Sequence, residues 1–518
     1  MIFEGFNSIQ HVLMLVAMVL FVMSLWLHVK EKDTWSLALL LVAALCINLF
    51  AAMLDPFLNV WDERFHALVA RNMIDHPLLP TLYDDPVVPM DYDRWDRYHI
   101  WLHKQPLFMW QMALSFRVFG ISELSMRLPN VLLGVAMVFA VYRSAKLVAN
   151  SRTAFVAAWL VISSFYLVQM LAGRQQLDQN DYSFLAYVNL SVWAFIEYIN
   201  NKNKLLFAVL AGVFAGAAVL CKWLPGLLVF LIWGVYNLAE YRLQWRAYWH
   251  MLAALAVACL VFVPWQLLCY VWYPAEFAAA SSLNAMHFTH AVDGQAGSFW
   301  YHFYRFQPIY GSLAAFAIVP GFVFLLRRQT NGRLIWAMLA AVLFVYVFYA
   351  LAKTKMPSFT LLLALPMYVA LAEFIGQASG FVSQKIRRAV PVSLFFGLLM
   401  TAIVLIRFDA PGLHRIHNTG NPDNYVAAMA LANKAVFESL DCNSNAVLFN
   451  IPGRHYIEAM FYTGLPAYGF IPDYEQYLHL KNLRRSIVIF STNPAELPEY
   501  LLADTEVIVM QQQLYRFD

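Results

Sequence analysis

Charged residues and cysteines are scarce in this sequence. Asp, Glu, Lys and Arg make up 13% of the 518 residues, whereas hydrophobic residues make up 61%. Soluble globular proteins have about 25% charged and roughly 45–50% apolar residues. The composition therefore excludes a soluble enzyme, a nucleic-acid-binding protein and a disordered chain.

The sequence also lacks a disulfide framework and the common nucleotide and metal motifs. Four of the five cysteines lie in or at the ends of apolar runs, and only Cys442 lies in a polar region, so we interpret them as small hydrophobic residues. We find no G-x-x-x-x-G-K-[ST], no G-x-G-x-x-G at a strand–helix junction and no H-E-x-x-H motif. A water-soluble nucleotide donor or an ATP-driven pump therefore has no visible site. Few charges lie within the apolar runs, which argues against a proton-coupled transporter.

Long apolar runs are the main feature that the sequence does have. Runs of 17 or more residues, such as 12–29 and 36–54, can cross a hydrocarbon core of about 30 Å at about 1.5 Å per residue. The first run has no basic segment before it and no small-residue cleavage site after it, which indicates a retained helix and not a signal peptide. We predict a polytopic α-helical membrane protein with about 12–13 spans, the twelve clear ones being 10–28, 35–54, 131–148, 152–171, 182–199, 205–220, 223–238, 249–267, 309–326, 334–351, 358–376 and 390–406.

Basic residues gather on one side of these predicted helices. When the sides alternate, the short loops of one face hold 15 of the 35 Lys and Arg residues. The positive-inside rule assigns that face to the cytoplasm. The outer face then holds both termini and the long segments 55–130, 268–308 and 407–518, with ten of the 32 acidic residues in the first of these.

The apolar stretch 106–120 does not fit this alternation. Counting it as a span would exchange the sides of every later loop and break the charge pattern. We therefore expect it to lie along the outer membrane surface or to be re-entrant.

The chain changes character after residue 406. The β-rich runs 445–451, 485–491 and 505–510 alternate with helical or turn-like stretches. We therefore predict two domains, a membrane domain over 1–406 and a small outer α/β domain over 407–518.

Candidate functional residues appear first in the segment 55–130. Asp62 and Glu63 are adjacent carboxylates. One hypothesis is that they serve as a general base or hold a metal. The alternative is that they only interact with the free backbone amides and the dipole of a helix N-terminus. Lys104 is the first residue of a Trp-rich stretch. We expect it either to bind a lipid phosphate or only to extend its ammonium group to the lipid headgroups. His99 and His103 would share a helix face, as metal ligands can, but no third ligand is evident.

Further ionisable residues lie at predicted outer helix ends. Arg174, Asp178 and Asp181 follow the fourth helix on the side of Asp62, where interfacial anchors are also common. Lysines are uncommon at outer turns according to the positive-inside rule. Such lysines either bind an anion, such as a lipid-linked phosphate, or are simply exposed to solvent. Three lysines are at such positions: Lys222, Lys353 and Lys355.

Six motifs occur in order between residues 35 and 376. The first three motifs are Asp62–Glu63 followed by Ala70–Arg71, KQPLFMW at 104–110 and FGISELSMRLP at 119–129. The three motifs that follow are Arg174 with Asp178 or Asp181, CKWLPGL at 221–227 and KMPSFTLLLALP at 355–366. In these motifs and their order the chain resembles the C-type-fold membrane glycosyltransferases, namely the protein O-mannosyltransferase superfamily with the lipid A aminoarabinose transferases.

The chain departs from the family pattern at several places. His103 stands where a glutamate commonly precedes the lysine, and Phe359 stands where a tyrosine is usual. The segment 84–97 is longer and more acidic, and the helix at 10–28 is an addition. Because of the departure at His103, the resemblance does not determine the identity of the sugar. It also does not determine whether a divalent metal is a cofactor.

The resemblance implies a glycosyltransferase of the bacterial inner membrane that takes its sugar from a polyprenyl-phosphate donor within the bilayer. Lys104, Arg174 and Lys355 would hold the donor phosphate, and Asp62 with Glu63 would be catalytic, so that an envelope lipid, glycan or protein is glycosylated with inversion. If the acceptor is itself a phosphate, Asp62 only positions it. The acceptor or cavity residues would be Asp178, Asp181, His103, Lys222 and Lys353.

Two other functions remain open at this stage. A flippase or transporter for lipid-linked sugars would need polar groups along the helix bundle, whereas here they gather at the predicted outer rim. A non-catalytic sugar-binding partner would keep glycan transfer unchanged on Asp62→Ala. No nucleic-acid partner is expected, and membrane lipids surround the chain.

Overall fold

The chain forms two compact units. One, here the helical unit, comprises Met1–Met53, Lys104–Phe108 and Leu128–Leu413; the other, here the mixed unit, comprises Leu54–His103, Met109–Arg127 and His414–Asp518. The predicted domain boundary at 406 differs from this division because most of 55–127 belongs to the same unit as the C-terminal residues. The computed structural model describes residues 6–60, 62–89, 98–174, 179–328, 331–386, 391–422 and 424–517.

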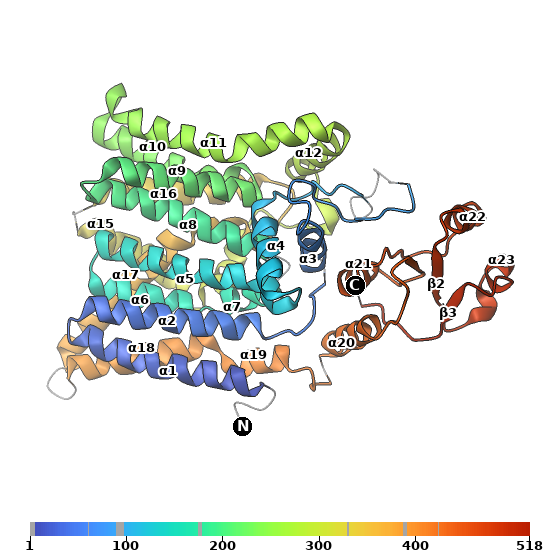
Figure 1. The fold of residues 1–518 in the computed structure, drawn as a ribbon. Helices are drawn as coiled ribbons and strands as arrows, with labels where there is room; N and C mark the ends of the chain where they lie inside the picture. The colour runs from blue at the N-terminus through green and yellow to red at the C-terminus, as the bar shows by residue number, and fades with distance from the viewer. Residues whose placement is uncertain are drawn as a thin grey trace. The chain divides into compact units, whose positions relative to one another are not determined.

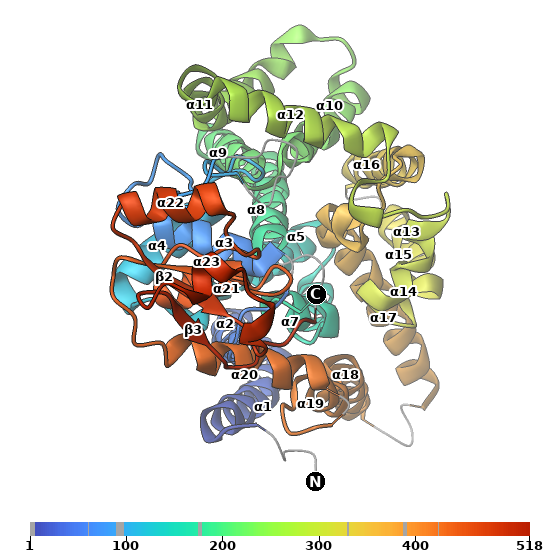
Figure 2. The same ribbon diagram turned by 90° about the vertical axis from the view of Figure 1, so that its right-hand side faces the viewer.

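The helical unit consists of long helices that lie side by side with nearly parallel axes (Figure 1). Figure 2 shows many of them viewed along their axes. Among the described residues, nine helices are long and apolar enough to cross a membrane, and two bent pairs bring the number to eleven. The main helices are α1 (Ser8–Val29), α2 (Asp33–Ala52), α5 (Glu123–Val148), α6 (Ser151–Ile162), α7 (Phe165–Leu171), α8 (Gln179–Asn200), α9 (Lys204–Lys222), α10 (Leu228–Tyr241), α11 (Trp249–Trp272), α15 (Ala314–Arg327), α16 (Gly332–Leu351), α17 (Ala364–Ile386) and α18 (Val392–Phe408).

Every one of the twelve predicted spans coincides with a helix or a bent helix pair. The α6–α7 pair bends by 48° and forms the predicted span 152–171. The predicted span 182–199 is α8, which carries several polar residues and is buried over most of its length. The predicted fold class, a polytopic α-helical membrane protein with a small α/β part, is confirmed.

Ion pairs connect basic residues that the sequence assigned to the cytoplasmic face with carboxylates elsewhere in the helical unit. Each pair connects a basic residue near a helix end with a carboxylate on another helix. Pairing lowers the cost of removing these charges from water. The helix alternation read from the sequence agrees with these contacts. The pairs are Lys146–Asp33 (2.7 Å), Arg143–Glu197 (2.8 Å), Arg328–Glu373 (2.8 Å) and Arg333–Glu240.

The ambiguous apolar stretch forms the short helix α4 (Leu107–Phe119). Its 13 residues extend about 20 Å at about 1.5 Å per residue, less than the roughly 30 Å of a hydrocarbon core. The helix is therefore too short to span a membrane alone, in agreement with the prediction from the charge pattern.

The mixed unit contains a three-stranded parallel sheet in the order β1–β2–β3, of which Figure 2 labels β2 and β3. The strands are β1 (Ala446–Phe449), β2 (Ser486–Phe490) and β3 (Ile508–Met510), within the three β-rich runs of the sequence. The runs in β1 and β2 are continuous and apolar because parallel strands are usually covered on both faces. The helices of this unit are α3 (Asp62–Asn72), α4, α20 (Tyr425–Glu438), α21 (Tyr456–Thr463), α22 (Tyr474–Asn482) and α23 (Glu499–Leu502), and α19 (Ala410–His417) ends in it.

Candidate functional site

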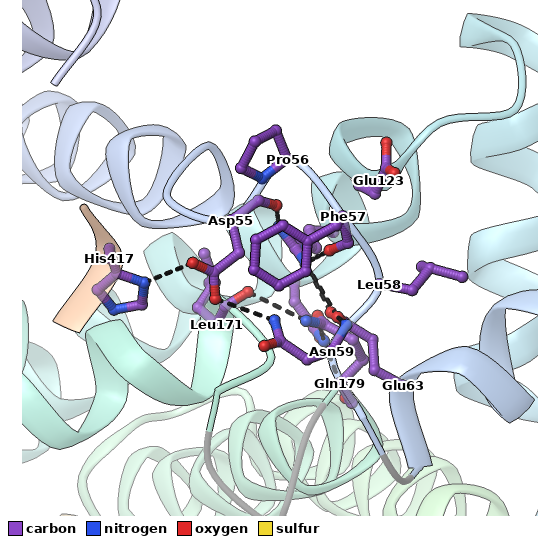
Figure 3. Close-up of polar contacts among 12 residues, drawn as sticks. Asp55, Pro56, Phe57, Leu58, Asn59, Glu63, Glu123, Leu171, Gln179 and His417 are labelled. Atoms are coloured by element: carbon purple, nitrogen blue, oxygen red, sulfur yellow. Dashed lines mark hydrogen bonds and ion pairs between the residues drawn. The ribbon is translucent and has the colours of Figure 1, made fainter. Parts of the chain in front are cut away.

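The segment before Asp62 is held by a network of buried polar groups in the mixed unit (Figure 3). The carboxylate of Asp55 accepts hydrogen bonds from His417 Nδ1 at 2.8 Å and from Asn59 Nδ2 at 3.0 Å. The backbone N–H of Asn59 donates to Glu63 Oε2 at 2.7 Å. The loop 55–60 therefore has a defined conformation that leads directly into α3.

Arg127 occupies the centre of this network. Its guanidinium donates to both carboxylate oxygens of Glu63, each at 2.9 Å, and to the carbonyl oxygens of Asp55 at 2.6 Å and Phe57 at 3.1 Å. Both charged side chains are 0% exposed. A bidentate pair fixes position as well as charge, so it links α3 to the start of α5.

The two adjacent carboxylates of the predicted catalytic pair have different surroundings. Glu63 is enclosed and bound by Arg127, whereas Asp62, the first residue of α3, is partly exposed. Asp62 also lies at a helix N-terminus, where the free amides favour a negative charge. Of the two carboxylates, Asp62 is the more exposed.

Arg71, the end of the Ala-Arg motif, joins α3 to the C-terminus of α21. Its guanidinium donates to the carbonyl oxygen of Phe461 and contacts that of Met460 at 3.4 Å. A cation at this position also complements the negative end of the helix dipole. The residue that ends α21 is Gly464, whose φ of 75° is left-handed.

We expect Gly464→Ala to destabilise the mixed unit by about 1 kcal/mol or more, because a left-handed φ is costly for alanine. An added Cβ would also lie 2.6 Å from Arg71 Nη2. Thermal unfolding of the purified protein measures the effect. In an Arg71→Ala background the steric part of the cost disappears, so the same glycine substitution should cost less. Equal costs in both backgrounds would contradict the contact.

A second group of polar residues lies in the helical unit, where α8, α9 and the 3-10 helix Pro357–Leu363 meet. Lys222 Nζ donates to Asp181 Oδ1, which also accepts a hydrogen bond from Ser358 Oγ at 3.0 Å. The Lys222 ammonium lies 5.2 Å from the ring centroid of Phe359. The sequence predicted Asp181 and Lys222 separately, and the structure pairs them.

Lys355 follows α16 and is 2% exposed. Its Nζ donates to the carbonyl oxygens of Tyr349 and Ala350, both at 2.7 Å, near the negative end of the helix dipole. Among the described side chains no carboxylate forms an ion pair with it. Burial, and secondly the charge of Lys353, lower the pKa of Lys355. A buried cation without a counter-charge is suited to binding an anion.

The chain is similar in sequence and in fold to several known proteins. A family model described as dolichyl-phosphate-mannose-protein mannosyltransferase matches residues 103–267. The crystal structure of ArnT from Cupriavidus metallidurans bound to undecaprenyl phosphate has a TM-score of 0.59 at 17% identity, covering 86% of this chain and 87% of ArnT. The chain is therefore similar to membrane glycosyltransferases, in sequence over residues 103–267 and in fold over most of its length. The archaeal oligosaccharyltransferase AglB from Archaeoglobus fulgidus has a similar fold, with a TM-score of 0.55 at 13% identity over 84% of this chain and 64% of AglB.

Two curated relatives that this chain resembles in sequence are both described as undecaprenyl phosphate-α-4-amino-4-deoxy-L-arabinose arabinosyl transferases. One, from Shewanella sediminis, is 25% identical over 67% of this chain, and the other, from Pseudomonas fluorescens, is 26% identical over 73%. The matched regions span 62% and 63% of these relatives' own lengths. With its apolar helices, the chain is a multi-pass bacterial membrane protein.

The remaining predicted site residues in the described part of the chain lie in the helical unit, apart from His99 and His103. Lys353 is exposed, and Lys104 and Arg174 are half-buried in the helical unit. Asp178 lies outside the described residues. The predicted pairing of Asp62 with Asp178 or Asp181 stays a prediction.

The expectation that His99 and His103 share a helix face is wrong. Residues 98–103 are not helical, and Ile100 instead forms a bridge with Thr81. His99 packs against the Tyr83 ring, His103 packs against the Trp101 ring, and burial lowers the pKa of His99. Within the described part of the chain, no three His, Cys, Asp or Glu side chains are grouped so that they could hold a metal ion.

Sequence reasoning did not single out several of these residues. Arg127 and Ser358 lie within quoted motifs, so the motifs carried a signal that was not read as a role. Asp55 directly follows an apolar run, a weak signal of a polar residue at a helix exit. For His417 we find no signal in the sequence, because its partner is distant in the chain.

Proposed function

We propose that the protein transfers a sugar from a polyprenyl-phosphate-linked donor to an envelope acceptor. The observation that carries this proposal is the buried Lys355, a cation without a carboxylate partner among the described residues. It occurs in a fold shared with ArnT bound to undecaprenyl phosphate and with AglB in complex with a dolichol-phosphate. A donor that enters from the bilayer also explains why the sequence has no nucleotide motif.

On the donor side, Lys355 binds the phosphate together with Lys104 and Arg174. The sugar is linked to a phosphodiester with one negative charge, and the departing polyprenyl phosphate carries a second one. Cations placed at the phosphate therefore stabilise the transition state more than the bound donor. Lys222, already paired with Asp181, contributes to the surrounding cavity with Lys353.

On the acceptor side, Asp62 accepts the proton of an attacking hydroxyl. The acceptor oxygen forms a bond to the anomeric carbon while the bond from that carbon to the phosphate oxygen breaks, so that the configuration inverts. Glu63 takes no proton in this scheme, because Arg127 holds both of its oxygens. It positions the loop and α3, and through them Asp62. An acceptor that is a phosphate needs no base, and Asp62 then only orients it.

We also propose the orientation in the membrane. The basic short loops face the cytoplasm, and the acid-rich segments with the candidate residues face the periplasm. The acceptor is accordingly an envelope lipid, glycan or protein.

Transfer in proteoliposomes tests this proposal, using labelled polyprenyl-phosphate sugars with a crude envelope extract as the acceptor. We expect transfer by the wild type and a loss of about 100-fold or more in both Asp62→Asn and Lys104→Ala. Asp75→Asn and Lys202→Ala are matched controls, because both residues are exposed and lie outside the proposed site. Thermal unfolding checks that each variant folds.

Two results would contradict the proposal. Labelled lipid that crosses the bilayer without any transfer, and without an effect of either substitution, would indicate a flippase. Transfer that is unchanged in Asp62→Asn and Lys104→Ala would remove both residues from the site.

A further inference from the structure

His302 is a fully buried histidine in the helical unit that the proposed reaction does not yet use. It lies in the short helix α13 (Tyr301–Tyr304), and its side chain is 0% exposed. The imidazole lies beside two aromatic rings, at centroid distances of 6.0 Å from Tyr349 and 6.3 Å from Phe359. The same two rings contact each other at 4.7 Å, and Phe359 also lies under the Lys222 ammonium.

The polar atoms of this imidazole lack sufficient partners. The nearest backbone acceptor is the carbonyl oxygen of Tyr349, which already accepts a hydrogen bond from Lys355 Nζ at 2.7 Å. Neither ring nitrogen has a well-formed hydrogen bond to a described residue, so at least one nitrogen is left unmatched. Buried polar groups are normally satisfied, so an unmatched ring nitrogen points to a ligand that is bound during function.

The segment that carries His302 is attached directly to Lys355. The backbone N–H of Lys355 donates to the carbonyl oxygen of Gln295 at 2.8 Å, and that of Thr354 donates to His287 at 3.1 Å. At Gly297 the chain approaches so closely that an added Cβ would lie 2.9 Å from Lys355 Cγ. The chain segment just before His302 is therefore packed against Lys355.

We propose that His302 is a second group that binds the phosphate of the lipid donor, beside Lys355. This inference rests on the proposed function and deepens it. The imidazole donates one N–H to a phosphate oxygen. When the bond between the anomeric carbon and the phosphate oxygen breaks, the electron pair stays on that oxygen and the acceptor proton moves to Asp62. The hydrogen bond from His302 is then stronger to the departing phosphomonoester than to the diester.

Binding by the full-length protein in nanodiscs tests this role, with undecaprenyl phosphate and uncharged undecaprenol as probes. We expect His302→Phe to weaken binding of undecaprenyl phosphate by about 10- to 100-fold and to leave undecaprenol unchanged. His302→Gln keeps an N–H donor and should retain most of the affinity. In transfer assays kcat should fall more in His302→Phe than KM for the donor rises.

The outcomes separate this inference from the proposed function. A wild type that binds undecaprenyl phosphate no better than undecaprenol would overturn both. A wild type that prefers the phosphate, with the same preference in His302→Phe, would overturn only the role of His302. A purely structural role would lower affinity for both probes together. If His302→Phe fails to fold, His302→Leu provides the second apolar variant, and an unchanged preference there counts equally against the inference.

Discussion

Lys355→Met is expected to lower glycosyl transfer by about 100- to 1,000-fold, the size of effect seen when one group that stabilises a developing negative charge is removed. The substitution keeps the length and apolar stem of the side chain and removes only the buried cation. The departing phosphate then gains its second charge without the nearest counter-charge. The rate with a saturating polyprenyl-phosphate sugar in proteoliposomes measures this, and Lys355→Arg should retain part of the activity because it keeps the charge.

The controls distinguish chemistry from folding. Lys355 also binds the Tyr349 and Ala350 carbonyl oxygens at the end of α16, so some loss of thermal stability is expected as well. Lys202→Met, at an exposed loop position, should leave both transfer and stability unchanged. Transfer near the wild-type rate in a folded Lys355→Met protein would remove Lys355 from the donor site.

Arg127→Met is expected to destabilise the mixed unit by about 3–5 kcal/mol, because it leaves the Glu63 carboxylate buried without its partner. The free carbonyl oxygens of Asp55 and Phe57 add to this cost. Transfer should fall at the same time, because loop 55–60 and α3 position Asp62. Thermal unfolding and protease resistance of the purified protein measure the first effect, and the proteoliposome assay measures the second.

The double variant Glu63→Leu with Arg127→Met removes both charges together. Replacing a buried pair by apolar side chains is often nearly neutral, so the double variant should be more stable than Arg127→Met alone. Arg117→Met, on the exposed face of α4, is the matched control and should have no effect. An Arg127→Met protein that unfolds like the wild type would show that the Glu63–Arg127 pair does not hold this loop.

The polar residues around Lys355 and those around Arg127 differ in how their charges are paired. In the helical unit Lys355 lacks a carboxylate partner among the described residues, whereas in the mixed unit Glu63 and Arg127 satisfy each other. Unmatched charge is suited to a ligand, and matched charge is suited to holding a backbone in place. This difference separates the residues proposed to bind substrate from those that position them.

The sequence by itself determined the membrane class, the place of the twelve predicted spans and the three strands of the sheet, but it did not predict α12 (Pro274–Thr289). Whether a segment of about 20 residues crosses a bilayer depends on the transfer of its own side chains and on hydrogen bonds within the segment, so this information is local. The information that predicts the strands is also local, because β1 and β2 lie in continuous apolar runs of the sequence. The ordered motifs likewise identified Asp62 and Lys355 as candidates.

Only the tertiary structure decided what those candidates contact. Glu63 and Arg127 are 64 positions apart, and Asp55 and His417 are 362 positions apart. The sequence equally predicted a helix for His99 and His103, whereas a bridge to Thr81 makes that segment extended. Pairing, burial and the lack of a partner depend on segments that meet only when the chain is packed. For that reason the residue types indicated the chemistry, and the packing separated the groups that are satisfied from those that remain available to a ligand.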